Sequence, residues 1–385
     1  MLLLWIAGVL VAGLGTAYVS SSTVRYVGRA GMEEARILKN ARPLDKIAAD
    51  TKAPPEQRAV AALVLEVRGF ADSLGYAAGD TYTTYSDVGR DTLILSLSAS
   101  RKDCICPYEW KWPIVGKVPY KGFFDPAEGL KAKAEFEAKG YDTYLRPAPA
   151  FSTLGWFKDP LLSTAVSNDS VELASLVFHE IAHNTLYVPS ATAFNESFAQ
   201  YAGYLATERF FRARGDSVKA ARAADRWHDE QLLGRYYERL VARLDSLYTS
   251  KPDSAALEAG RAEAGAWVKA ELEGWVKDSA RTFQIGTVSA RSVNNAALVG
   301  VRIYRTELAL FEAWHRQHGG DVAAAVAALR TLLEGARGDE AFARLRAAVQ
   351  AKAAEAIAPN VAPAEAVPPE APLDAPADTA SVPIS

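Results

Sequence analysis

The stretch V-F-H-E-I-A-H at residues 177–183, together with F-N-E-S-F-A at residues 194–199, decides the fold. The first stretch has the pattern H-E-x-x-H. Residues four apart lie on one face of a helix, so His179 and His183 can direct two imidazoles toward one metal ion. Glu180 lies beside the first histidine, where its carboxylate can reach a water molecule held by that metal. Zinc hydrolases use this arrangement to activate water.

A catalytic zinc site usually has three protein ligands and leaves a fourth position for water. Glu196 follows His183 by 13 residues and is the candidate third ligand. Pro189 predicts the end of the first helix, and apolar residues near helical spacing predict a second helix over residues 193–210. Two antiparallel helices would bring Glu196 back against the histidines. The sequence thus predicts one zinc ion per chain, bound by His179, His183 and Glu196.

A structural helix with two incidental histidines is the alternative, because H-E-x-x-H occurs by chance in many unrelated proteins. The chain has only five histidines, which makes a chance match less frequent. Most residues around the motif are apolar or small, as expected for a buried active-site helix. The companion pattern N-E-x-x-A at residues 195–199 is typical of zinc hydrolases with a glutamate ligand.

Several further stretches resemble a bacterial family of predicted zinc aminopeptidases, whose members look like envelope-anchored proteins. They are residues 120–124, 140–142, 151–157, 159–164, 192–199 and 294–296. The resemblance covers roughly residues 25–335. It implies a gluzincin-like aminopeptidase, whereas the motif residues themselves indicate a zinc hydrolase.

The composition is that of an ordinary globular protein. The chain has 385 residues, of which 49% are hydrophobic and 23% charged, and its formal net charge is −3. It contains neither a basic block nor interleaved basic and aromatic residues, so we expect no nucleic-acid partner.

The two cysteines, Cys104 and Cys106, form a C-x-C pattern. A disulfide between residues two apart is strained, which favours two ordinary thiols. A small-ring disulfide and a second metal site remain as alternatives.

Residues 2–19 form an uncharged, apolar run just long enough to span a bilayer. We interpret segment 1–22 as a retained membrane anchor, with a cleaved secretion signal as the alternative. Arg25 and Arg29 follow the run and no Lys or Arg precedes it, which by charge would leave the main domain in the cytoplasm. The resemblance implies the opposite side, so we expect a membrane-anchored, extracytoplasmic domain in the periplasm or at the cell surface.

The patterns predict an α+β fold that is predominantly helical. We expect one zincin-like metallopeptidase domain over residues 25–357. It would contain a β-rich part at about 80–160, the zinc helices at about 171–214 and a helical part at about 216–357. Residues 358–385 are rich in Pro, Ala and acidic residues without Lys or Arg, and such a composition predicts a disordered tail.

Two long charged segments in the helical part, residues 220–247 and 254–281, are separated by Pro252. They predict a helical hairpin. Residues 57–74 carry apolar residues on one side and predict an amphipathic packing helix.

Other residues are candidates for contact with a substrate. Thr153 and Gly155 precede the motif helix, where an edge strand could pair with a peptide backbone; a packed strand without ligand is the alternative. Tyr304, on a later helix, could donate a hydrogen bond to the oxyanion of the reaction. Asn294 and Asn295 could hold a substrate amine or carbonyl, or else cap a helix.

The sequence therefore predicts a membrane-anchored zinc metallopeptidase acting on peptides, with aminopeptidase activity implied by the resemblance. Exopeptidase and endopeptidase action both remain open. The alternatives are a zinc amidase acting on cell-envelope material and a non-catalytic envelope scaffold. The scaffold is disfavoured because the general base and all three candidate ligands are present.

Overall fold

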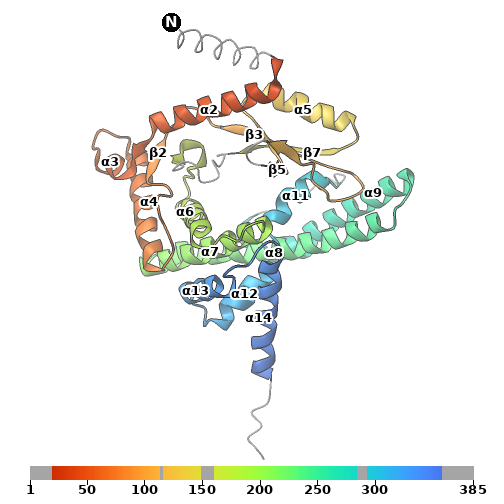
Figure 1. The fold of residues 1–385 in the computed structure, drawn as a ribbon. Coiled ribbons are helices and arrows are strands. Elements are labelled where there is room, and N and C mark those ends of the chain that lie inside the picture. The colour runs from red at the N-terminus through yellow and green to blue at the C-terminus, as the bar shows by residue number, and fades with distance from the viewer. Residues whose placement is uncertain (1–19, 113–115, 149–159, 284–292, 358–385) are drawn as a thin grey trace, which may run out of the picture.

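The computed structural model describes residues 20–112, 116–148, 160–283 and 293–357. These residues are mostly helical, with a small β part, which confirms the predicted α+β class. Figure 1 shows the sheet strands lying between helices α2 (Ser22–Asn40), α5 (Pro126–Ala138) and α11 (Asn295–Tyr304).

The centre of the fold is a helical hairpin of α6 (Ser170–Thr185) and α7 (Thr192–Ala213). Asp169 caps α6 by accepting a hydrogen bond from the backbone N–H of Val171 at 2.9 Å, which satisfies a donor left free at the helix start. α6 ends shortly before Pro189, as the sequence predicts. Nine of its 16 residues are buried and seven of these nine are apolar, so α6 lies inside the core.

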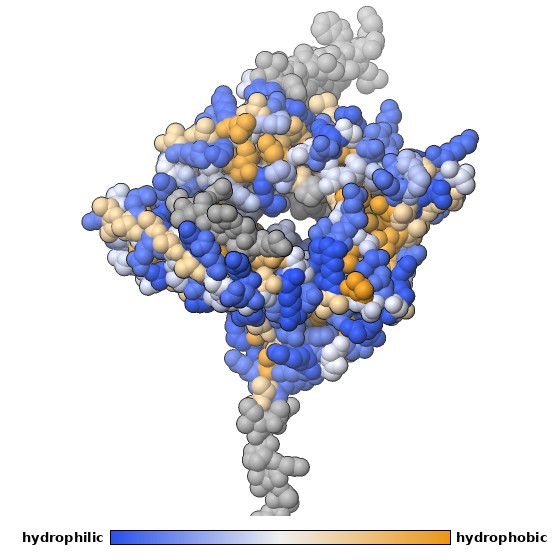
Figure 2. Space-filling model, turned by 180° about the vertical axis from the view of Figure 1, so that it is seen from behind, coloured by the Kyte–Doolittle hydropathy of each residue, from blue (hydrophilic) through white to orange (hydrophobic). Residues whose placement is uncertain are grey.

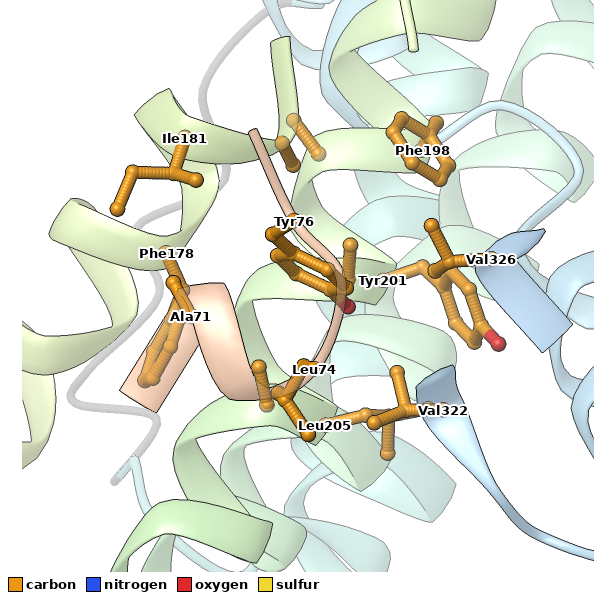
Figure 3. Packing of buried hydrophobic residues seen from close by; sticks show 14 of the residues in the cluster. Ala71, Leu74, Tyr76, Phe178, Ile181, Phe198, Tyr201, Leu205, Val322 and Val326 are labelled. Atoms are coloured by element: carbon orange, nitrogen blue, oxygen red, sulfur yellow. The ribbon is translucent and has the colours of Figure 1, made fainter. Parts of the chain in front are cut away.

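The largest apolar core encloses this hairpin. Around it pack α4 (Pro55–Ser73), α8 (Ser217–Thr249), α12 (Leu308–Gln317) and α13 (Val322–Leu332). Figure 3 shows side chains of the hairpin packed against residues of neighbouring elements. The hairpin residues are Phe178, Ile181, Phe198, Tyr201 and Leu205, and their neighbours are Ala71, Leu74, Tyr76, Val322 and Val326. Each fully buried large side chain contributes about 1.5–3 kcal/mol. The core thereby fixes the two helices that carry the motif residues.

A three-stranded antiparallel sheet lies beside the hairpin. β3 (Ile94–Ser100) is its central strand, between β6 (Lys121–Phe123) and β7 (Asp142–Ala148). In the register, the first and last residues of β3 pair with the last and first residues of β7. α5 and α11 both pack against β3 and β7.

The remaining regular elements are short. A second sheet joins β1 (Arg42–Pro43), β2 (Thr84–Ser86) and β8 (Leu161–Leu162), with the last two strands parallel. β4 (Trp110–Trp112) pairs with β5 (Gly116–Val118). The short helix α3 (Leu44–Ala49) and a 3₁₀ turn at Ser163–Ala165 complete this part of the chain.

The predicted helical hairpin of the C-terminal half is present, but its second arm is interrupted. α8 is followed by α9 (Ser254–Glu271), a π-helical turn at Leu272–Val276 and the short helix α10 (Lys277–Ser279). The interruption lies at Gly274, whose backbone has φ −93° and ψ −120°. A second apolar cluster holds the arms together.

Cys104 and Cys106 form a disulfide. The prediction of two ordinary thiols is therefore wrong, and the small-ring alternative is the one the structure has. The surrounding loop is fixed by Arg261 of α9, which is 3% exposed and donates to the carbonyl of Lys102 at 2.8 Å. The same guanidinium bonds the carboxylate of Asp142 at 2.6 Å, which ties α9 to strand β7.

α12, α13 and α14 (Glu340–Ile357) end the described part of the chain. The tail predicted for residues 358–385 lies outside the described residues.

The prediction of a membrane-anchored, extracytoplasmic protein is contradicted. Within residues 20–357, gaps excepted, no helix combines the length and the apolar character needed to cross a bilayer. The first described helix, α2, carries charged residues along its length. The apolar run at residues 2–19 lies outside the described residues. Figure 2 shows that the face opposite to the view of Figure 1 is hydrophilic over most of its surface.

Candidate metal centre

The helical hairpin brings the three predicted metal ligands together. The Nε2 atoms of His179 and His183, one turn apart on α6, lie 3.2 Å from each other. Glu196, near the start of α7, places its Oε2 atom 3.4 Å from the first and 3.6 Å from the second. The three side chains are between 12% and 22% exposed. Among the described residues, this is the one group whose ligand atoms converge closely enough to hold a metal ion.

The spacing of the three ligand atoms can be compared with that of a zinc site. Zinc–ligand bonds of about 2.0–2.1 Å at tetrahedral angles separate neighbouring ligand atoms by about 3.3–3.5 Å. The separation of 3.4 Å lies in this range, and those of 3.2 and 3.6 Å lie within about 0.1 Å of its limits. Two imidazole nitrogens and one carboxylate oxygen are also a donor set that zinc accepts. The residues therefore fit a zinc ion.

Electrostatics keep the glutamate ionised. Burial alone raises the pKa of Glu196, but the hydrogen bonds and charges of His179 and His183 outweigh it and lower that pKa to about 2. Burial lowers the pKa of His183, yet the carboxylates of Glu196 and Glu180 raise it on balance. The ligand set thus offers a carboxylate anion to a cation.

The general-base candidate, Glu180, is the neighbour of His179 on α6 and is partly exposed. Its charge raises the pKa of His183 and that of Tyr304, so its carboxylate is within electrostatic reach of the candidate ligands. The residue is therefore available both to solvent and to a molecule bound at the centre.

Asn195 positions the ligand that follows it. Its side chain is 3% exposed and makes two hydrogen bonds with Val188 in the α6–α7 connection, one to the backbone N–H and one to the carbonyl, each 2.9 Å long. The neighbouring Pro189 carbonyl accepts a hydrogen bond from Gly338 at 2.8 Å. The path of the connection, and with it the first turn of α7 that leads to Glu196, is thereby fixed.

α7 approaches α6 closely at Gly203. A methyl group at this position would lie 3.1 Å from the carbonyl oxygen of Ser175 and 3.3 Å from the Cβ of His179. One turn later, Thr207 bonds Ser175 at 3.1 Å. The close crossing is needed for a ligand on α7 to reach ligands on α6.

Tyr304, the last residue of α11, lies near the ligand set. Its ring centroid is 6.4 Å from that of His179. Burial and the nearby carboxylates of Glu196 and Glu180 raise the pKa of Tyr304, so the phenol remains a hydrogen-bond donor. The turn after it is anchored by Ser197, whose buried hydroxyl accepts a hydrogen bond from the N–H of Thr306 at 3.0 Å. The residue next to the third ligand thus fixes the backbone next to Tyr304.

The asparagine pair has other partners in this structure. Asn294 caps α11, accepting from the N–H of Ala297 at 3.0 Å and donating to the carbonyl of Thr143 at 2.9 Å. Asn295 is fully buried, accepts a hydrogen bond from Tyr248 and donates to carbonyls of the disulfide loop. The helix-cap alternative describes Asn294. Both side chains hold α11 in place.

The other two substrate-binding candidates, Thr153 and Gly155, lie outside the described residues. The structure instead adds two residues that sequence reasoning missed, Tyr120 and Arg146, whose hydroxyl and positive charge both influence the pKa of Tyr304. Tyr120 belongs to a stretch that carries the family resemblance. No local pattern singled out Arg146.

Comparison with known protein families agrees with this geometry. A family model described as Putative aminopeptidase matches residues 25–343. The chain belongs to this family. The match spans the β part, the helical hairpin and α11, so every described residue of the site lies within it. Family membership supports a peptidase. Searches of curated proteins and of solved structures gave no match.

Proposed function

We propose that this member of the family is a zinc-dependent metallopeptidase of the gluzincin type, with an aminopeptidase as the activity that its family description suggests. The observation that carries the proposal is the convergence of His179, His183 and Glu196 at separations that fit one zinc ion. The peptide-bond specificity rests on the family description.

The chemistry that zinc supplies in such a site is polarisation of the scissile carbonyl and acidification of a water molecule. Glu180 would accept a proton from that water and pass it to the leaving amine, as a general base and then a general acid. Tyr304 would donate its phenol hydrogen to the oxygen that becomes negatively charged. Glu180 directly follows His179, and the Tyr304 ring centroid lies 6.4 Å from that of His179; neither residue serves as a ligand in this assignment.

Replacing the proposed base tests the mechanism. Glu180→Gln keeps size and hydrogen bonding but removes the proton acceptor, so we expect peptide hydrolysis to fall about 100-fold to 10,000-fold. Zinc content should stay at the wild-type level, measured by inductively coupled plasma mass spectrometry on the same preparation. The matched control is Glu172→Gln, an exposed glutamate of the same helix that pairs with Arg226. Equal turnover by wild type and Glu180→Gln would contradict the assignment.

A further inference from the structure

Strand β7 presents one of its faces to the helix that carries Tyr304. Side chains alternate along a strand, so Asp142, Tyr144 and Arg146 share one face and Thr143 and Leu145 share the other. On the second face, Thr143 bonds Glu137 of α5 at 2.8 Å. On the first face, the carboxylate of Asp142 accepts from the N–H of Asn295, the first residue of α11, at 2.8 Å. α5 therefore covers one face and α11 lies on the face of Arg146.

The lengths of these two elements bring Arg146 toward the candidate centre. Arg146 follows Asp142 by four residues, which corresponds to a distance of about 13 Å along the strand. The helical path from Asn295 to Tyr304 has a similar length of about 13 Å, and α11 packs along β7 (Figure 1). Because Asn295 at the start of α11 binds Asp142 and Tyr304 at its end lies near His179, these lengths place Tyr304 level with Arg146.

The electrostatics of two tyrosines agree with this placement. Burial raises the pKa of Tyr304 most, Glu196 raises it further, and the positive charge of Arg146 partly offsets both effects. The charges of Glu196 and Arg146 also act on Tyr120, which precedes β6, the first raising its pKa and the second lowering it. The charges of Arg146 and Glu196 therefore both act on these two hydroxyls.

Arg146 itself is exposed. No described residue forms a hydrogen bond or an ion pair with its guanidinium. The two carboxylates that act on Tyr304, Glu180 and Glu196, already have roles as base and ligand in the proposed mechanism. Among the described residues, the charge left for a substrate at this end of α11 is thus positive. A guanidinium has the fork geometry that matches a carboxylate.

We propose that Arg146 binds a carboxylate of the peptide substrate. The carboxylate would be either the C-terminus of a short peptide or an acidic side chain near the scissile bond. This inference rests on the proposed peptidase function. It adds a substrate class to that function, namely peptides with a carboxylate at this position. A site that bound only a free α-amine would need a negatively charged group where Arg146 is positively charged.

Matched peptides test the inference on the zinc-loaded full chain. One pair differs only in a C-terminal carboxylate or amide, and a second pair only in Glu or Gln next to the scissile bond. We expect one pair to show a preference of about 10-fold to 100-fold in kcat/KM for the carboxylate form, the range for a charge-assisted hydrogen bond. The pair that shows it identifies the source of the carboxylate.

Variants assign the preference to the arginine. Arg146→Ala should abolish it and Arg146→Glu should reverse it, whereas Arg330→Ala, an exposed arginine of α13, should retain it. Binding of the same peptides to zinc-loaded Glu180→Gln, measured by calorimetry, should weaken when Arg146→Ala is added. This second readout does not depend on turnover.

The outcomes separate this inference from the function on which it rests. Equal rates and equal binding for the carboxylate and neutral forms of both pairs, or a preference that survives Arg146→Ala, would overturn the inference alone. Failure of zinc-loaded wild type to hydrolyse any peptide would overturn the proposed function, and the inference with it.

Discussion

Gly203 and Asn195 lie on the same helix as the third candidate ligand, Glu196. Both residues position this helix and are not ligands themselves. Gly203 lets α7 approach the backbone of α6 at His179, where a methyl group would lie 3.1–3.3 Å from its neighbours. Asn195 fixes the start of α7 through Val188. Together they set the position of α7 along α6 and its distance from α6, and thereby where the Glu196 carboxylate lies relative to the two imidazoles.

Gly203→Ala should weaken metal binding without touching a ligand. The added methyl group would push α7 away from His179, and such overpacking costs about 1–3 kcal/mol. We expect zinc affinity, measured by competition with a chelator, to fall about 10-fold to 100-fold, the range seen when outer residues of a metal site are changed.

The control is Gly69→Ala on α4, where a methyl group meets no atom within 4 Å. It should leave zinc affinity unchanged and raise helix stability by up to about 1 kcal/mol. Wild-type zinc affinity in Gly203→Ala would show that the close crossing does not position the site.

The motif pattern was sufficient to predict that His179, His183 and Glu196 lie together, because helical periodicity places the histidines on one face and a proline separates the helices. The same reasoning could not find Gly203 or Arg146. The role of each depends on the approach of elements distant in sequence, and neither residue stands in a chemical pattern of its own.

At the scale of elements, Asp229 ties the end of the interrupted arm back to α8. Its side chain is 4% exposed and lies 3.0 Å from the Nδ1 atom of His228. It accepts hydrogen bonds from the backbone N–H groups of Arg281 and Thr282 and from the Thr282 hydroxyl. Burial by itself raises the pKa of Asp229, but these partners outweigh it and lower that pKa on balance.

A lowered pKa makes the contribution of Asp229 to stability depend on pH. The contribution is complete above the unfolded pKa of about 3.9 and is lost as the pH falls through the lower folded pKa. Asp229→Asn should therefore lower the free energy of unfolding in urea by about 1–3 kcal/mol at pH 7. The difference from wild type should shrink below about pH 4.

Asp225→Asn is the matched control, because Asp225 pairs with the Arg281 side chain at 3.0 Å but is 39% exposed. It should change the free energy of unfolding by less than about 1 kcal/mol. A deficit in Asp229→Asn that stays the same from pH 7 to pH 3 would contradict the linkage.

Most helices could be predicted at this scale, since apolar spacing, capping residues and prolines are local signals. The break in the second arm at Gly274 was not predicted, and the disulfide between Cys104 and Cys106 was only an alternative to the predicted thiols. A single glycine does not usually end a helix, and a disulfide between such close residues depends on how the surrounding loop is held. Here Arg261 and Asn295 bind the carbonyls of that loop.

At the scale of the whole molecule, the candidate site is assembled from three parts of the chain. The hairpin of α6 and α7 supplies the ligand set, α11 supplies Tyr304, and β7 supplies Arg146. The sequence predicted the fold class and the hairpin but not how the sheet and α11 meet it. That arrangement depends on buried polar contacts, such as Asp142 with Arg261 and Asn295, between residues more than 100 positions apart.

The zinc content of purified protein tests the central claim most directly. We predict close to one zinc per chain for wild type and for Glu208→Ala, a glutamate farther along α7 that pairs with Arg212. We predict a strong loss for Glu196→Ala, measured by plasma mass spectrometry after dialysis, with circular dichroism to show that each protein is folded. A folded wild type without zinc, or Glu196→Ala with the full wild-type content, would contradict the account.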